Sequence, residues 1–139
     1  MKVKEMMHKG VQSVSAETPI GTVASKMKQF DIGAVPVERD GELIGMITDR
    51  DIAIRCFSNG KDISAMTAGE VMSADPIYCR DNEEVEDAVR LMESKEIRRL
   101  PVLDEAQAIV GMVSLGDISQ ALPRDISGEM AKAVSAHHP

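Results

Sequence analysis

The stretch Leu43–Ile52, LIGMITDRDI, occurs a second time in the chain as IVGMVSLGDI at Ile109–Ile118. In each copy an apolar run passes through a glycine to a hydroxyl residue, and a carboxylate follows three positions later. Self-similarity of this kind constrains a fold more than any local pattern does, because one small repeat cannot bury its apolar face alone. The chain is therefore expected to fold as a duplicated unit.

The rest of the chain repeats in the same order. Val3–Met7, VKEMM, falls on Ala68–Met72, AGEVM, at an offset of 65 residues. After the turn at Arg39–Glu42 the offset becomes 66, which needs one extra residue in a surface loop, where repeats tolerate insertions. The duplication predicts a first repeat at 1–58, a linker at 59–67, a second repeat at 68–122 and a tail at 123–139.

Each repeat is predicted to run strand, helix, strand, strand, helix. Thr18 and Pro19 predict a helix start with a capping hydroxyl and proline in the first helical position. Pro36 cannot donate to a ladder, so it predicts a sheet edge or a strand end. The last helix is expected at Asp49–Phe57. Apolar residues at i, i+3, i+4 and i+7 predict one buried helix stripe per repeat, at Ile20, Val23, Ala24 and Met27 and at Val85, Ala88, Val89 and Met92.

These elements predict an α+β fold in which the two repeats pack face to face across a pseudo-twofold axis. The 43% of apolar residues suffices for one core, although only 2% of residues are aromatic. The scarcity of aromatic side chains and the formal charge of −7 argue against nucleic-acid binding. No apolar run approaches the roughly 18 residues of a membrane span, and the first residues lack a signal-like apolar segment. The expected location is cytoplasmic, with no membrane partner.

Catalytic and metal motifs are missing from the sequence. Two cysteines, Cys56 and Cys79, are too few and too far apart for a disulfide scaffold or a zinc motif, and are expected to be reduced and buried. The histidines, His8, His137 and His138, lie near the chain ends. Because no nucleophile elbow, P-loop or Rossmann pattern is present, the sequence predicts neither an enzyme nor a metal protein, and no required cofactor.

The paired motifs carry a family resemblance. DIGAVPV with GMITDRDI in the first copy, and EIRRLPV with GMVSLGDI in the second, resemble the motifs of the cystathionine-β-synthase (CBS) domain pair, or Bateman module, over about residues 3–121. The chain is similar to small stand-alone CBS pairs of the hypoxic-response type. The resemblance implies a regulatory module that binds AMP, ADP, ATP, S-adenosylmethionine or NAD in the cleft between the repeats. It also implies a homodimer and an unknown protein partner.

The family's ribose and phosphate motif is a glycine, two apolar residues, Ser or Thr, two variable residues and then Asp or Asn. The resemblance implies that the carboxylate takes the ribose hydroxyls, that the hydroxyl lies near a phosphate, and that adenine slots between apolar strand residues. The binding residues it implies are Gly45, Thr48, Asp51, Val35, Pro36 and Val37 in the first copy, and Gly111, Ser114, Asp117, Leu100, Pro101 and Val102 in the second.

Three arginines are the cationic candidates for a phosphate, because a guanidinium fork suits phosphate oxygens. They are Arg50, Arg98 and Arg99, each with a solvated surface position as the alternative. The first copy has Gly33 and Ala34 in place of Arg98 and Arg99, which predicts two unequally furnished sites.

Simple chemistry supports binding, since a carboxylate can accept from both ribose hydroxyls at about 1.5–3 kcal/mol per bond. The same spacing also matches a helix capping box. We favour binding because capping requires no preceding glycine, whereas close approach of a ligand benefits from one. The alternative function is a ligand-free dimeric interaction or stress protein that responds to redox or metal through Cys56 or Cys79.

Overall fold

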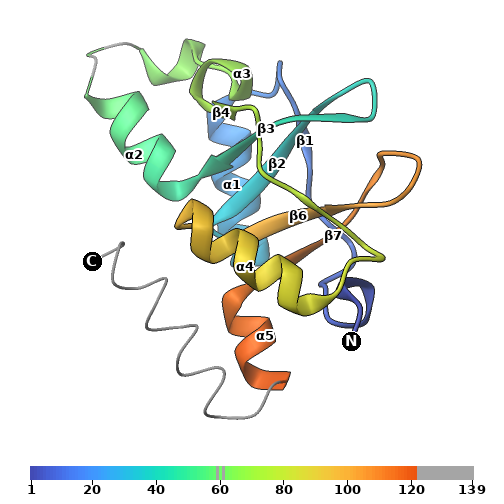
Figure 1. Cartoon of the computed structure of the whole chain (residues 1–139). Helices are drawn as coiled ribbons and strands as arrows, with labels where there is room; N and C mark the ends of the chain where they lie inside the picture. Colours follow the sequence, from blue (N-terminus) through green and yellow to red (C-terminus); the bar gives the residue numbers. More distant parts are fainter. Residues whose placement is uncertain (59, 61, 122–139) are drawn as a thin grey trace. The chain divides into compact units, whose positions relative to one another are not determined.

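The computed structural model describes residues 1–58, 60 and 62–121 (Figure 1). The chain forms two compact units, one of Gln12–Pro76 and one that combines Met1–Val11 with the chain from Ile77 onward. The first residues of the chain therefore belong with the second sequence repeat. The tail expected at 123–139, with its two histidines, lies outside the described residues.

The Gln12–Pro76 unit is built on a four-stranded sheet in the order β1-β2-β3-β4. Strand β1 is parallel to β2, while β3 is antiparallel to both β2 and β4. Its elements are β1 (Val14–Ser15), α1 (Ile20–Phe30), β2 (Ala34–Arg39), β3 (Glu42–Thr48), α2 (Asp49–Phe57), the 3-10 turn η2 (Ile63–Ala65), α3 (Ala68–Val71) and β4 (Ser73–Ala74).

The other unit repeats this plan with a three-stranded sheet in the order β5-β6-β7. His8 forms a bridge with Met112 on β7, in the register that Ser73 on β4 takes with Met46 on β3. The elements are the 3-10 turn η1 (Val3–Glu5), β5 (Cys79–Arg80), α4 (Val85–Lys95), β6 (Arg99–Leu103), β7 (Ile109–Ser114) and α5 (Leu115–Ala121). Two mixed sheets with helices confirm the α+β class and the predicted order of elements in each repeat.

The local predictions hold for most elements. Helix α2 has the predicted bounds, and the β2–β3 hairpin turns through Asp40 and Gly41 at φ 53° and 80°, as a tight primed turn requires. In α4 all four stripe residues are buried, whereas in α1 the stripe prediction is wrong at Ala24, which is exposed. An alanine methyl contributes little apolar area, so its exposure costs little.

The predicted start of α1 is wrong by one position. Pro19 is the N-cap residue rather than the first helical residue, and no side chain caps the helix. The Thr18 hydroxyl accepts instead from the backbone N–H of Ser15 at 3.1 Å. The N–H of Ile20 donates to the carbonyl of Met66 at 3.1 Å. A segment distant in sequence therefore satisfies the helix start.

Pro36 lies within β2 rather than at its end, and it pairs with Met46 on β3, but the other side of β2 is unpaired at this residue. Strand β1 pairs with β2 only at Val37 and Glu38. Strand β5 likewise pairs with β6 only beyond Pro101, at Val102 and Leu103. The missing proline donor is thus tolerated in both sheets, because the described part of the chain pairs no residue with either proline on the side of β1 or β5.

The first segments of the two repeats are exchanged between the units. The N–H groups of Val3 and Lys4 donate to the carbonyls of Glu83 and Asp81 at 2.9 and 3.0 Å. In the other unit, the N–H groups of Ala68 and Gly69 donate to the carbonyls of Thr18 and Ala16, both at 2.8 Å.

The exchanged segments complete the two cores. Val3 is fully buried among residues of the second repeat, and Ala68 and Val71 are fully buried among residues of the first. The opening segment of each repeat therefore packs into the core of the other repeat and completes it.

Candidate functional site

Thr48 and Asp51 form a capping box at the start of α2. The backbone N–H of Thr48 donates to Oδ2 of Asp51 at 2.9 Å, and the N–H of Asp51 donates to Oγ1 of Thr48 at 3.0 Å. The capping interpretation of this motif is therefore confirmed. Within the described residues, Oδ1 of Asp51 has no hydrogen-bond partner, and the half-buried side chain remains accessible.

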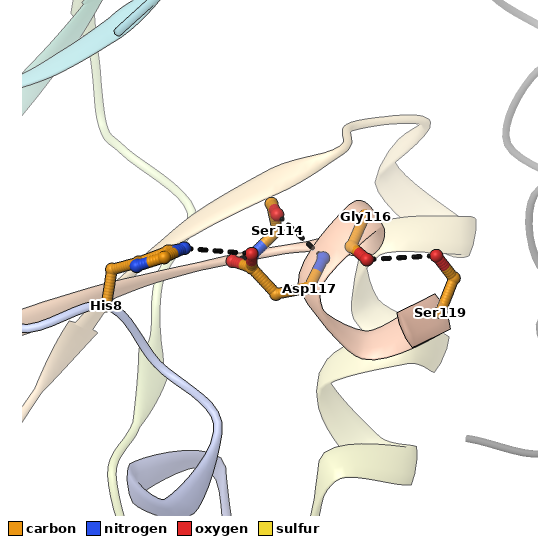
Figure 2. Close-up of polar contacts among 5 residues, drawn as sticks. All are labelled: His8, Ser114, Gly116, Asp117 and Ser119. Atoms are coloured by element: carbon orange, nitrogen blue, oxygen red, sulfur yellow. Dashed lines mark hydrogen bonds and ion pairs between the residues drawn. The ribbon is translucent and has the colours of Figure 1, made fainter. Parts of the chain in front are cut away.

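The second copy builds the same box at the start of α5 (Figure 2). The N–H of Ser114 donates to Oδ2 of Asp117 at 3.2 Å, and the N–H of Asp117 donates to Oγ of Ser114 at 3.1 Å. Here Oδ1 of the carboxylate does have a partner, because it lies 2.9 Å from Nε2 of His8. The two repeats thus present the same box with different surroundings.

The two motif glycines are explained by packing within each unit. A Cβ on Gly45 would lie 2.9 Å from the carbonyl oxygen of Ser73 and would collide with the Met72 side chain. A Cβ on Gly111 would lie 2.7 Å from the carbonyl oxygen of His8 and 2.6 Å from Sδ of Met7. The exchanged segments require these glycines, so the glycines no longer favour binding over capping.

The apolar strand residues of the motif are mostly core. Val35 and Val37 on β2 are fully buried, as are Leu100 and Val102 on β6. Because side chains alternate along a strand, the prolines between them face the opposite side of the sheet. Pro36 and Pro101 are buried as well, although their side chains lie on the face of the sheet opposite the core valines and Leu100.

The arginines are unequally distributed, as the sequence predicts. Arg99 on β6 pairs directly with Ser114 on β7, and the carbonyl of Arg98 accepts from the N–H of Leu115 at 2.8 Å. Both exposed arginines thus flank the Ser114–Asp117 box.

The first copy makes the same backbone contact without a cation. The carbonyl of Gly33 accepts from the N–H of Asp49 at 3.0 Å, and Ala34 pairs with Thr48. The cationic candidate in the first copy is Arg50, which is exposed in the first turn of α2.

His8 contacts the candidate site at Asp117, and the sequence analysis does not identify it. It is separated from Asp117 by 109 positions, and a histidine near a chain end has no local pattern that indicates a role. The repeat register offered the one usable signal, because His8 follows the VKEMM segment and falls on Ser73 of the other copy.

Both thiols are buried, in different units. Cys56 on α2 is 1% exposed and Cys79 on β5 is 2% exposed. Burial raises the pKa of both thiols, and for Cys79, where the Glu83 carboxylate adds to the effect, the pKa rises to about 12. Across residues 1–58, 60 and 62–121, no three His, Cys, Asp or Glu side chains are grouped so that they could hold a metal ion. In the same residues, no helix is long and apolar enough to span a membrane.

Comparison with known proteins places the duplication in a described family. The family model for the CBS domain matches residues 3–57 and 68–124. CBS domain-containing protein YhcV of Bacillus subtilis is 44% identical over 117 residues, which cover 84% of this chain and 82% of YhcV. Hypoxic response protein 1 of Mycobacterium tuberculosis is 36% identical over 133 residues, 94% of this chain and 92% of that protein. Neither relative has room for a separate catalytic domain of ordinary size.

Solved structures agree with this fold. A crystal structure of Hypoxic Response Protein I with two coordinated zinc ions has a TM-score of 0.80 and 35% identity, over 88% of this chain and 100% of that one. The CBS domain pair of protein MJ0100, in complex with 5′-methylthioadenosine and S-adenosyl-L-methionine, has a TM-score of 0.77 and 28% identity, over 87% of this chain and 98% of that one.

Proposed function

This chain belongs to the CBS domain family as a tandem CBS pair, and from that premise we propose that it is a regulatory module that binds an adenosine-containing ligand. The ligand class comprises AMP, ADP, ATP, S-adenosylmethionine, 5′-methylthioadenosine and NAD. Binding would favour one arrangement of the module over another, which a protein partner reads. The proposal includes no catalytic step. The location of the ligand between the repeats, the cytoplasmic setting and the homodimer stay predictions.

The observation that carries the proposal is the pair of oriented carboxylates. In each capping box a backbone N–H holds Oδ2 of the aspartate, at 2.9 Å for Asp51 and 3.2 Å for Asp117. The carboxylate is therefore fixed before any ligand arrives, which lowers the entropy cost of binding. Its Oδ1 atom can accept from the vicinal hydroxyls of a ribose. Capping and binding thus use different oxygens of one side chain and do not compete.

The arginines support a division of ligand chemistry between the two boxes. Arg98 and Arg99 flank the Ser114–Asp117 box. We call each capping box with its neighbouring residues a half-site, and the Asp117 half-site therefore suits a ligand that carries phosphate. The Thr48–Asp51 box has Gly33 and Ala34 at the equivalent positions, which suits an adenosyl compound with little negative charge. The MJ0100 pair, with two adenosyl compounds that carry no phosphate, supports the adenosyl class.

The test is a calorimetric titration of the full chain with each compound of the ligand class. Asp51→Asn and Asp117→Asn remove the charge at one half-site each while they keep an oxygen for the cap. We expect each variant to lose one binding event, or at least tenfold in affinity, because hydrogen bonds to a charged acceptor contribute about 1.5–3 kcal/mol.

The matched control is Asp104→Asn, because Asp104 also accepts backbone N–H groups but lies in the β6–β7 turn. This variant should bind as the wild type does. Failure of every compound to bind the wild type, or undiminished binding by both box variants, contradicts the proposed function.

The second candidate is a ligand-free interaction protein that responds to metal or redox through Cys56 or Cys79. Its support is the pair of zinc ions in the Hypoxic Response Protein I structure. The two cysteines of this chain are buried in separate cores. Titration with zinc, followed by sedimentation, separates the candidates, because this one predicts a change of mass with zinc and none with nucleotide.

A further inference from the structure

The two half-sites differ most at the outer oxygen of the aspartate. Nε2 of His8 lies 2.9 Å from Oδ1 of Asp117, and Oδ2 of the same carboxylate accepts from the N–H of Ser114 at 3.2 Å. Figure 2 shows the imidazole ring pointing at the carboxylate from the side opposite the capping box. Both oxygens of Asp117 are therefore engaged within the unit.

The backbone of His8 is held by two hydrogen bonds, whereas its side chain is mostly exposed and contacts Asp117 alone among the contacts described. The N–H of His8 donates to the carbonyl of Met112 at 2.8 Å, and the N–H of Met112 donates back to the carbonyl of His8 at 3.0 Å. The His8 side chain is 76% exposed, against 22% for Asp117. An exposed ring at a backbone position held by the bridge to Met112 can rotate about χ1 without disturbing the sheet, so this contact is one that a ligand could displace.

The other repeat lacks the contact. Ser73 takes the position of His8 and pairs with Met46 as His8 pairs with Met112. Its hydroxymethyl side chain is too short to reach across to a carboxylate as an imidazole does. In the described part of the chain, Oδ1 of Asp51 accordingly has no partner.

We propose that His8 is an affinity-determining residue of the Asp117 half-site, which it holds closed until a ribose displaces it. The inference rests on the proposed function, because it assigns His8 to the oxygen that the ribose hydroxyls would use. An incoming adenosyl ligand must break the His8–Asp117 contact, whereas at Asp51 it meets an accessible oxygen. His8 lowers the affinity of one half-site and leaves the other unchanged.

The experiment isolates each half-site in the full chain. Asp51→Asn leaves the Asp117 half-site, and Asp117→Asn leaves the Asp51 half-site. His8→Ser, which installs the residue of the other repeat, is added to each. The probe is 5′-methylthioadenosine, because it carries a ribose and no phosphate, so neighbouring arginines do not mask the ribose contact. AMP serves as the phosphate-bearing arm.

We expect His8→Ser to tighten binding of 5′-methylthioadenosine about three- to tenfold with Asp51→Asn, the size of one partly exposed charge-assisted hydrogen bond. With Asp117→Asn it should change nothing. The matched variant Ser73→His should weaken binding at the Asp51 half-site. Because His8 and Ser73 are not core residues, the melting temperatures without ligand should stay within about two degrees of each parent, which separates a binding effect from a folding effect.

Three outcomes overturn the inference. Unchanged affinity for both probes means that the imidazole is displaced at no cost. Weaker binding of AMP in the His8→Ser variant means that His8 contacts the ligand rather than closing the half-site. If neither probe binds to the wild type or to the two single-site parents, the result contradicts the proposed function together with the inference. The first two outcomes contradict the inference alone, because the single-site parents still bind the probes and the proposed function stands.

Discussion

The half-site aspartates, Asp51 and Asp117, stabilise helix starts whether or not a ligand is present. Each accepts from the backbone N–H of the N-cap residue in its own capping box, and thereby satisfies a donor that the helix itself leaves unpaired. Loss of the whole side chain would therefore reduce the stability of the protein along with the proposed ligand binding. This coupling is the reason that asparagine, which keeps an acceptor, is the informative substitution at both positions.

At the residue scale, the buried thiols should be inert in the folded protein. The pKa of Cys79 is raised from 9.0 to about 12, mainly by burial and then by the Glu83 carboxylate, so the thiol stays protonated at pH 8 and thiolate chemistry is suppressed. A water-soluble disulfide reagent at pH 8 should label neither cysteine of the native protein at an appreciable rate. It should label both after unfolding.

The raised pKa of Cys79 also determines how the stability of the protein depends on pH. A thiol whose pKa is higher in the folded state than in the unfolded state favours the folded state while it is protonated. Its contribution to the free energy of unfolding is fully present below about pH 9 and is lost as the pH rises toward 12. Labelling of Cys56→Ala and Cys79→Ala assigns each rate to one thiol. Rapid labelling of either thiol in the native protein would contradict the burial and would favour the redox candidate.

The residue-level predictions from sequence succeeded where the contact is local. The spacing of Thr48 and Asp51 is enough to predict a capping box, because the two residues lie one helical turn apart. The His8–Asp117 contact could not be predicted, because it depends on the fold that brings together positions 8 and 117. The glycine argument was wrong for the same reason, since Met72 and Met7, not a ligand, occupy the space beside Gly45 and Gly111.

At the scale of elements, the close approach of exchanged segments to β3 and β7 should be visible in stability. Gly45→Ala places a methyl 2.9 Å from the Ser73 carbonyl, and a backbone atom cannot yield as a flexible side chain can. We expect a loss of about 1–3 kcal/mol in the free energy of unfolding, as for overpacked cores. Urea denaturation followed by circular dichroism measures it.

The matched control is Gly21→Ala in α1, where an added methyl would meet nothing within 4 Å. This change should raise the free energy of unfolding by about 0.5–1 kcal/mol, because alanine favours a helix over glycine. If the two variants change stability alike, steric contact at Gly45 is not what the glycine avoids.

The helices and hairpins were predictable because their signals are local, as α2 shows by beginning and ending at the predicted residues. The exchange of η1 and α3 was not predictable. Both segments are too short to be stable unless they pack on something, and the duplicated sequence offers each of them two similar sheets. Periodicity indicates that a face must be covered but does not indicate which copy covers it.

At the scale of the whole molecule, the exchange predicts which fragment folds alone. Residues 12–76 contain all four strands of one sheet and its complete core, including Met66, Ala68 and Val71. Residues 1–58 follow the predicted sequence repeat but lack those three core residues. We expect a cooperative thermal transition by circular dichroism for the 12–76 fragment and none for the 1–58 fragment in dilute solution, where it stays monomeric.

The two fragments have similar lengths, so chain length does not account for the expected difference. The substitution Val71→Asp in the 12–76 fragment is the internal control, because Val71 is fully buried and an unpaired buried charge should abolish the transition. Cooperative unfolding of the 1–58 fragment would show that the exchanged segment is dispensable.

The exchange of the opening segments between the repeats also bears on how such a chain arises. Two separate one-repeat molecules would each lack a partner for the opening segment and could satisfy it only by reciprocal domain swapping. Such a dimer dissociates on dilution. Fusion of two copies in one polypeptide makes the same exchange intramolecular. The effective concentration of each opening segment at the other repeat is then set by the connecting chain and not by the amount of protein. Duplication thus converts an assembly into a fold that survives at any concentration.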